Sequence, residues 1–441
     1  SDPWVRPHRP HKPSWEIRSL RCGRSQKKPR KEIAAPRSSC AHFYRTHAEN
    51  ESGGVYLTPM SLWNDEQPRP LGHLRVIDST IMLTGPYVTR MLAQYGADVV
   101  KIEGLPEGDP LRNLKNTSLF ELLNQGKKSL ALNLKTPTGI EAIRRLVAES
   151  DVYVENFREG VMDRLGLGYP ELSEINPDLL YVSLRGMSGK NASHSGHDLN
   201  FVATSGCGDW FLESGVPNYS TFFGDVVGGA LVPVIKILAH LANPQRKGMH
   251  LHCYMDEGFR ALYVTRAFDA YKAQSLPPGE REKYGASVIF SGNFPHSKYY
   301  RCRDNTWVAL QAIQKKHWDI FCEVIDHQQW KDRFEDVTLV PELERLFSDA
   351  PSSYWAALAS SREICLFRVI PFQEHLENTQ AKAQLSTDPF TWMGLQPNNS
   401  LLPTPTLGKD TFTVLHNIGF GNKEIASGIQ TGTFGSSEKL P

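Results

Sequence analysis

The sequence predicts an α/β protein with two domains, the larger of which is built on a mainly parallel sheet. Strand-like apolar runs alternate with helical patterns from residue 74 to residue 184. The first strand, helix and strand fit within about 30 residues, the length of a right-handed βαβ unit. A charged loop rich in Pro and Gly, 277–283, then precedes a hairpin and three helices. We therefore expect a Rossmann-like large domain followed by a smaller α+β domain.

Each element is predicted from its own pattern, in chain order. Short apolar runs predict buried strands, and apolar residues at helical spacing predict helices, with Pro86 in the first turn of the first helix. The expected strands are 74–78, 97–102, 129–133, 152–154, 179–184 and 249–255, and the expected helices are 86–95, 139–149, 160–165, 170–175 and 259–274. In the second domain we expect a hairpin of strands 298–301 and 307–310, then helices 317–326, 341–348 and 354–361.

The same patterns divide the chain into five parts. The first 50 residues hold twelve Lys and Arg against four Asp and Glu, so residues 1–70 are predicted to form a basic extension that is disordered or serves as a targeting segment. The large domain is expected over 71–275 and the small domain over 276–385. A proline-rich, extended return to the large domain is expected over 386–425, followed by a frayed tail over 426–441.

Composition excludes several classes of protein. The net charge is +1 and no nucleic-acid module follows the basic extension, so no nucleic-acid partner is expected. No apolar run reaches the roughly 18 to 20 residues that span a bilayer, so we expect no membrane span. The seven cysteines include no CxxC pair, which favours a reducing intracellular compartment, mitochondrial or cytoplasmic, with a peroxisomal location left open. Strand alternation separates His250 and His252 from Cys253, so no metal site is expected.

Two stretches place an ionisable side chain beside glycine and against apolar residues. His197 lies in 195–201 and Asp225 lies in 222–229. Such placement presents an acid or a base at the mouth of a buried pocket. A local hydrogen-bonded pair for His197 and a helix N-cap for Asp225 are the structural alternatives. If the two side chains face each other across a substrate, they can remove a proton from one face of a carbon and return it to the other, which is the logic of a two-base racemase.

Basic residues gather near the predicted strand ends. In parallel sheets, ligands bind beyond the carboxyl ends of the strands. Five cations near such ends suggest a polyanionic ligand, although each alone could be a solvated surface charge: Lys101, Arg112, Lys127, Lys128 and Arg158. Sequence motifs of other enzymes are missing from the chain, namely GxGxxG after the first strand, the Walker loop, GxSxG and HExxH. A nicotinamide enzyme, a P-loop nucleotidase, a serine hydrolase and a zinc protease are therefore not expected.

The order of the motifs resembles a known family. The segments that carry the resemblance are 74–78, 84–86, 96–103, 108–110, 124–129, 133–137, 151–168, 176–177, 196–201 and 224–229. Together they make the chain similar to the class III coenzyme A transferase and α-methylacyl-CoA racemase superfamily, over roughly residues 71 to 320. The resemblance implies an interlocked homodimer with active sites between domains and chains. It also implies a coenzyme A thioester as substrate, no permanently bound cofactor, and the five basic residues as contacts to the CoA phosphates.

The family that the chain resembles includes enzymes of two reaction types. In the racemase branch, residues at the positions of His197 and Asp225 exchange the α-proton of a 2-methylacyl-CoA through an enolate, and Glu257 matches the acid that holds the imidazole. In the transferase branch, the carboxylate at the position of Asp225 is a nucleophile that forms an acyl anhydride and then an aspartyl-CoA thioester. The Gly-His-Asp-Leu-Asn-Phe motif favours the racemase. Gln314, which stands where the family usually has Glu, and a transferase-like glycine loop at 291–295 leave the transferase open. A CoA-binding protein without turnover is a third reading.

Overall fold

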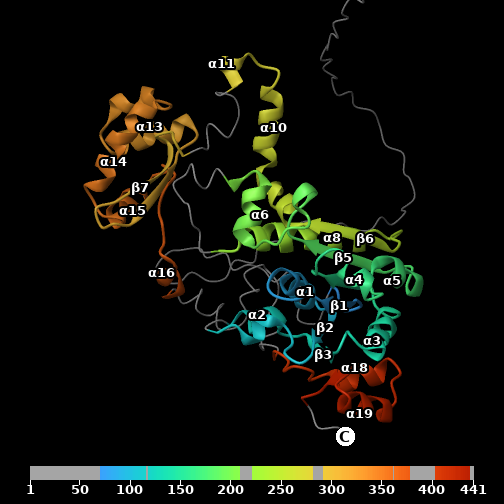
Figure 1. Ribbon diagram of the computed structural model, residues 1–441. Coiled ribbons are helices and arrows are strands. Elements are labelled where there is room, and N and C mark those ends of the chain that lie inside the picture. The colour runs from blue at the N-terminus through green and yellow to red at the C-terminus, as the bar shows by residue number, and fades with distance from the viewer. Residues whose placement is uncertain are drawn as a thin grey trace, which may run out of the picture. The chain divides into compact units, whose positions relative to one another are not determined.

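The computed structural model describes residues 70–115, 118–208, 221–281, 292–360, 362–377 and 403–437 (Figure 1). The predicted basic extension lies outside the described residues, except for its last residue, and so does most of the proline-rich segment before residue 403.

The large domain is built on a seven-stranded sheet with the order β10-β3-β2-β1-β4-β5-β6. Neighbouring strands from β3 to β6 pair in parallel, and only the last pair, β10 with β3, is antiparallel. The strands are β1 (Arg75–Ser79), β2 (Asp98–Gly104), β3 (Lys128–Leu132), β4 (Val152–Glu155), β5 (Leu180–Arg185), β6 (Met249–Tyr254) and β10 (Phe434–Gly435). Without β10 the order is 3-2-1-4-5-6, so the chain reverses direction across the sheet between β1 and β4. The predicted mainly parallel, Rossmann-like fold is confirmed.

Helices cover both faces of this sheet. The helices of the large domain include α1 (Thr84–Gln94), α2 (Leu119–Asn124), α3 (Pro137–Val147), α4 (Val161–Arg164), α5 (Tyr169–Ile175), α6 (Asp198–Ser205), α8 (Val232–Leu241), α9 (Met255–Phe259), α10 (Val264–Ala273) and α11 (Pro278–Arg281). Short 3-10 turns are η1 (Pro110–Asn113), η2 (Gly189–Asn191) and η4 (Arg260–Tyr263), and η3 (Gly224–Leu231) is a π-helix. Alternate residues of one strand enter different cores: Val76 packs with α1 and α8, whereas Ile77 packs with α3 and α5.

The end of the chain differs from the prediction. Residues 411–435 form α18 (Thr411–Asn417), α19 (Asn422–Gln430) and β10; α18 packs against β3, and α19 packs against α18 and β10 (Figure 1). The prediction of a frayed tail from residue 426 is therefore wrong for residues 426–435. Ile425 and Phe434 are buried in the same core as β3, and a few apolar residues in a polar sequence were enough to anchor the segment.

A second difference concerns the helix predicted over 259–274. The structure divides that segment into the end of α9, the 3-10 turn η4 and the helix α10. The apolar spacing predicted one element because a 3-10 turn of only 4 residues is too short for its period to be distinguished from that of an α-helix.

The small domain has its own core. Its sheet is antiparallel with the order β7-β8-β9, formed by Ser297–Arg301, Trp307–Gln311 and Leu366–Arg368. The predicted hairpin is β7 and β8, and the three predicted helices are α13 (Lys315–Val324), α14 (Val340–Ser348) and α15 (Ser352–Ser360). Trp318 and Phe321 are fully buried at the centre of this core. The remaining short elements are η5 (Gln328–Arg333), η6 (Val337–Leu339) and α16 (Phe372–Glu377).

One continuous helix of the described residues, Gly224–Leu241, passes a length-and-composition test for a membrane span. It consists of η3 and α8. Ala230, Val234 and Ile237 from this helix lie in the core that α1 shares with the sheet, and a core helix of a water-soluble protein passes the same test. The feature is thus weak evidence for a membrane span.

Candidate active site

The structure brings His197 and Asp225 into the same region through two short helices. His197 immediately precedes α6, and its backbone N–H donates to Asn200 Oδ1 at 3.0 Å. Asp225 is the second residue of η3, and its backbone N–H donates to Asp198 Oδ1 at 2.9 Å. Gly224 permits this approach, because a Cβ there would lie 3.0 Å from the Asp198 carbonyl oxygen. Asp198 therefore links the residue after His197 to the residue that carries the second predicted acid–base group.

The Asp225 carboxyl occupies an environment that favours its neutral form. Burial and the neighbouring charge of Asp198 raise its pKa to about 6, while a hydrogen bond from Thr84 and the charge of His197 act in the opposite direction. Thr84 Oγ1 donates to Asp225 Oδ1 at 3.1 Å. The charge of His197 is the smallest of these influences, and the two residues are linked through Asp198, whose Oδ1 accepts from the Asp225 N–H. A carboxyl with a pKa near neutrality is suited to exchange protons.

Glu257 does not join this pair through a hydrogen bond. It lies in α9 with an exposed side chain, and its backbone N–H donates to Asp256 Oδ1 at 2.8 Å. Within the described part of the chain, no hydrogen bond joins Glu257 to His197. The neighbouring Asp256 is 2% exposed and accepts bonds from both the N–H and the hydroxyl of Ser188, each at 3.1 Å. The role of Glu257 in holding the imidazole stays a prediction.

Lys101 and Lys127 are buried rather than presented to solvent. Lys101 Nζ lies 2.9 Å from Asp109 Oδ2, and Lys127 Nζ lies 2.8 Å from Asp78 Oδ2, with all four side chains fully buried or nearly so. Burial alone would raise the pKa of Asp78, but the two ammonium charges hold it well below its usual range. Contact of either lysine with a phosphate stays a prediction, and it would require these ion pairs to open.

The other three basic residues lie in different settings. Arg112 donates through Nε and Nη2 to the two carboxylate oxygens of Glu103, each at 2.7 Å. Lys128 is the first residue of β3, so it lies at the amino end of the sheet, where it pairs with Asp98 at 2.8 Å. Arg158 is exposed after β4 and donates to the hydroxyl of Ser195, two residues before His197. Of the five, only Arg158 is seen to contact the loop that carries His197.

The sheet reversal brings two loops together near this region. The loop after β1 meets the loop after β4, because the Ile81 N–H donates to Asn156 Oδ1 at 2.9 Å and Asn156 Nδ2 donates to the Ile81 carbonyl at 2.8 Å. Thr84 follows the first loop, and Arg158 lies in the second. Crevices at such a reversal are the usual ligand site of open α/β sheets.

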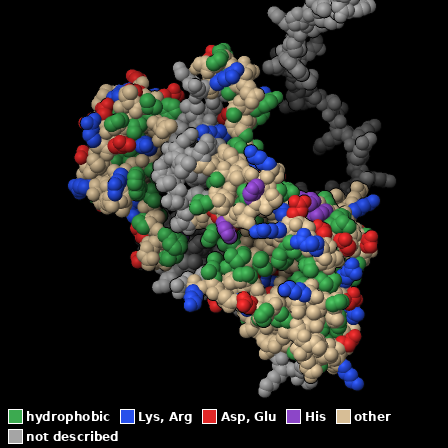
Figure 2. All heavy atoms as spheres, in the orientation of Figure 1, with side chains coloured by type: hydrophobic (Ala, Val, Ile, Leu, Met, Phe, Trp, Pro, Cys, Tyr) green, Lys and Arg blue, Asp and Glu red, His purple; other side chains and the backbone are tan. Residues whose placement is uncertain are grey.

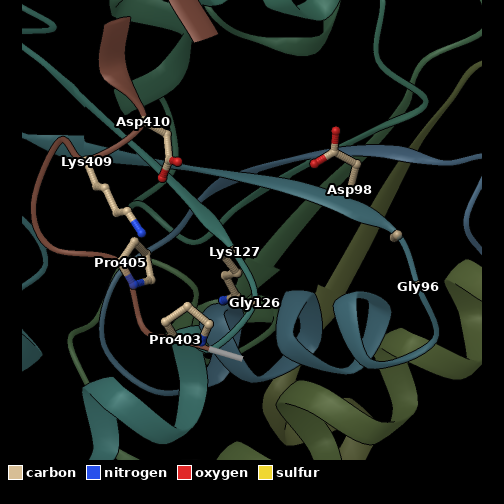
Figure 3. A pocket seen from close by; sticks show the side chains of 9 residues that line it. Gly96, Asp98, Gly126, Lys127, Pro403, Pro405, Lys409 and Asp410 are labelled. Atoms are coloured by element: carbon tan, nitrogen blue, oxygen red, sulfur yellow. The ribbon is translucent and has the colours of Figure 1, made fainter. Parts of the chain in front are cut away.

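A separate hollow of about 400 Å³ lies at the amino ends of β2 and β3 (Figure 3). It is lined in part by Asp98 at the start of β2, Gly126 just before β3, and Lys409 and Asp410 from the returning chain. The hollow is therefore distinct from the region of His197 and Asp225.

Sequence reasoning missed three residues of the site: Thr84, Asp198 and Asp256. Asp198 directly follows His197, and Asp256 directly precedes Glu257, so an acidic neighbour in each motif was the available signal. Thr84 stands in one of the family-like segments, 84–86, but nothing there indicated a contact with Asp225, some 140 positions away in the sequence.

The fold and the site define an α/β protein with a carboxyl–imidazole pair near the reversal point of a doubly wound sheet. The sequence model of the family described as CoA-transferase family III matches residues 71–391, and the chain belongs to this family. The chain is 27% identical to human α-methylacyl-CoA racemase over 385 residues, covering 80% of this chain and 94% of that protein. It is 24% identical over 395 residues to (R)-2-hydroxy-4-methylpentanoate CoA-transferase from Clostridioides difficile, covering 80% and 96% of the two chains.

Solved structures show the same fold. A CaiB/BaiF family protein from Brucella suis superposes with a TM-score of 0.63 at 22% identity, covering 80% of this chain and all of that chain. The Rv3272 protein from Mycobacterium tuberculosis superposes with a TM-score of 0.64 at 22% identity, covering 79% and 99%. The relatives by sequence include both racemases and CoA-transferases, so family membership leaves the reaction type to be decided by the site.

Proposed function

We propose that the protein is an acyl-CoA racemase or epimerase that inverts the α-carbon of a 2-methyl-branched or related acyl-CoA. The observation that carries this proposal is the hydrogen bond from the Asp225 N–H to Asp198 Oδ1 at 2.9 Å, which links Asp225 to the residue that follows His197, together with a carboxyl pKa of Asp225 raised to about 6. One of the two groups removes the α-proton from one face, and an enolate forms. The other group returns a proton to the opposite face, so that the product differs from the substrate only in configuration. The thioester acidifies the α-proton, and hydrogen-bond donors near the enolate oxygen would lower the barrier further.

A CoA-transferase is the second candidate, and one specific observation favours it. Glu257 makes no hydrogen bond to His197 within the described residues, whereas Asp225 is anchored by Thr84 and Asp198. In this reaction the Asp225 carboxylate attacks the thioester carbonyl and releases the CoA thiolate, giving an acyl-aspartyl anhydride. The thiolate then attacks the aspartyl carbonyl and releases the first acid, and the resulting aspartyl-CoA thioester passes CoA to a second carboxylate.

Incubation with a chiral 2-methylacyl-CoA in deuterated water separates the candidates. The racemase incorporates deuterium at the α-carbon and loses optical purity, and His197→Ala should abolish the loss of optical purity. The transferase instead moves CoA to an added carboxylic acid, and His197→Ala should spare this transfer. Neither deuterium uptake nor CoA transfer from any acyl-CoA tested would contradict both candidates and leave a protein that binds CoA without turnover.

We also propose that the working form is an interlocked homodimer that takes CoA thioesters as substrates and holds no permanent cofactor. Apolar side chains on η4 and α10 support the dimer, because Leu262, Val264, Phe268 and Tyr271 are each more than half exposed in the single chain. Exposed hydrophobic side chains are scattered among charged ones elsewhere on the visible face (Figure 2). Sedimentation equilibrium would show twice the chain mass, and a monomer that is fully active would contradict the proposal.

A further inference from the structure

Thr84 donates a hydrogen bond to Asp225 that the sequence motifs did not predict. We propose that Thr84 is a positioning residue that holds Oδ1 of Asp225 and thereby leaves Oδ2 as the oxygen that meets the substrate. The inference rests on the proposed function, in which Asp225 acts on an acyl-CoA, and it applies to either of the two reactions.

The Thr84 side chain is fixed on both of its branches. Thr84 is the first residue of α1 and is 4% exposed. Its methyl group lies against Gly229, because a Cβ on that glycine would approach Thr84 Cγ2 to 2.5 Å. Its hydroxyl donates to Asp225 Oδ1 at 3.1 Å, with Met255 Sδ a weaker neighbour at 3.9 Å. A threonine whose methyl is wedged against one helix must direct its hydroxyl elsewhere, and here that direction is the carboxylate.

The Asp225 group is held at two of its atoms. The backbone N–H is bonded to Asp198 Oδ1, and Oδ1 is bonded to Thr84. Within the described part of the chain, Oδ2 accepts no hydrogen bond. An oxygen without a donor is the more basic and more nucleophilic of the two, so the geometry assigns the chemistry to Oδ2.

The loop that carries Thr84 is held from the interior by buried ammonium groups. Lys101 Nζ donates to the Thr80 carbonyl at 2.9 Å, and Lys127 Nζ donates to the Pro86 carbonyl at 3.0 Å. These bonds lie four residues before and two residues after Thr84. Charge-assisted hydrogen bonds from buried lysines are strong, so these two bonds hold the backbone on either side of Thr84 in place. The two lysines thus act on Asp225 through Thr84.

Removal of the hydroxyl should change the titration of Asp225. The bond from Thr84 stabilises the carboxylate and lowers its pKa, so its loss should move the acid limb of the pH–rate profile to higher pH. Titratable and charged side chains on the elements packed against η3 are Tyr87, Arg90, His197, Asp198, Lys236, His240, His250, His252, Cys253, Tyr254, Asp256 and Glu257. Of these, Asp198 and His197 act on Asp225 directly, and neither is altered by a substitution at Thr84.

The test compares Thr84→Val, which keeps the shape and loses the hydroxyl, with Thr84→Ser, which keeps the hydroxyl. We measure acyl-CoA turnover from pH 5 to 9 as deuterium uptake or CoA transfer, whichever the wild type shows, and CoA affinity by calorimetry. Thr84→Val should shift the acid limb upward by about one pH unit and lower kcat/KM at pH 6 by about fivefold, with an unchanged Kd for CoA. Thr84→Ser should restore both values to within about twofold of the wild type.

Two further variants keep the result interpretable. Thr411→Val removes another fully buried hydroxyl, which accepts a bond from the Ala131 N–H, and should lower Tm without moving the acid limb. Thr84→Ala removes the Thr84 hydroxyl without adding bulk, and it must shift the limb even if Thr84→Val does not fold. If Thr84→Val and Thr84→Ala both kept the acid limb of the wild-type pH–rate profile while Asp225→Asn was inactive, the inference would be overturned and the proposed function would stand. An active Asp225→Asn would instead overturn the proposed function.

Discussion

Two aspartates, Asp78 in β1 and Asp225 in η3, the first fully buried and the second partly buried, have pKa values shifted in opposite directions. Asp78 accepts bonds from Lys127 and Thr89, and its pKa lies well below the usual range. Asp225 accepts a bond from Thr84 but has the carboxylate of Asp198 beside it, and its pKa is raised to about 6. Each aspartate has a threonine donor, so the difference lies in the ammonium groups that only Asp78 contacts. A buried carboxylate that is paired with an ammonium group stays ionised and serves the structure. A carboxyl without such a partner has a raised pKa and can exchange a proton.

The largest expected effect is on catalysis at the unpaired aspartate. Asp225→Asn keeps the size of the side chain and removes its ability to take a proton or attack a carbonyl. Turnover should fall by roughly 10²- to 10⁴-fold, with the Kd for CoA changed less than about twofold. Rates and calorimetric affinities of the purified variant provide the measurement. Full activity would show that the group with the raised pKa is not the group that reacts.

The paired aspartate should instead govern stability. Lys127→Met leaves the fully buried Asp78 carboxylate without its closest ammonium partner, with Lys101 Nζ 4.0 Å away, which should cost about 3–5 kcal/mol of unfolding free energy. Chemical denaturation measures this loss, and exposed Lys128→Met is the matched control, expected within about 0.5 kcal/mol of the wild type. If Lys127→Met kept wild-type stability but lost CoA affinity, the phosphate contact expected from the sequence would be correct and the structural role wrong.

Much of the fold could be predicted from apolar patterns in the sequence. Strands β1 and β2 each contain a short apolar run, and they were expected within one or two residues of where they lie. Lys101 interrupts the second of these runs, and its partners could not be read because Asp78 and Asp109 meet it only through strand pairing and a loop. A lysine in a central strand was itself the signal that the charge is buried and paired.

The sequence identified those site residues whose ionisable side chains stand in a distinctive motif. His197 and Asp225 were found because each stands beside glycine in a distinctive stretch. Thr84 was missed because its role depends on Gly229 and Asp225, which the fold alone brings to it. The final strand β10 was missed for a related reason, since two residues suffice for a strand when β3 offers a free edge.

The pH dependence of stability should differ in sign between the two aspartates. The pKa of Asp225 is higher in the folded protein than its ordinary value of 3.8, so the folded state binds more protons between about pH 4 and 6, and stability falls as pH rises through that window. Asp225→Asn should therefore stabilise the protein at pH 8, by at most about 3 kcal/mol. Asp78 has a lowered pKa, and its contribution is present above its unfolded pKa and lost as pH falls.

Thermal unfolding from pH 3 to 8 checks this contrast. The Tm of Asp225→Asn should exceed that of the wild type at pH 8 and converge with it towards pH 4. Asp78→Asn should lie below the wild type at pH 8 and approach it only in acid. An Asp225→Asn variant that is less stable than the wild type at pH 8 would mean that the carboxylate of Asp225 is better compensated than its neighbours indicate.

The smallest expected effect separates the two ends of the sheet. Arg158 is exposed beside the loop that carries His197, at the carboxyl end of β4, whereas Lys128 is exposed at the amino end of β3. If a CoA phosphate binds at the carboxyl end, Arg158→Ala should raise the Kd for CoA by about 2- to 5-fold and change kcat less than about twofold, because an exposed ion pair is worth about 1 kcal/mol or less. Lys128→Ala removes an equal charge from the other end and should leave the Kd unchanged. Because salt screens an exposed pair, the difference between the two variants should shrink as ionic strength rises, and equal losses of affinity in both would place the phosphates at neither end in particular.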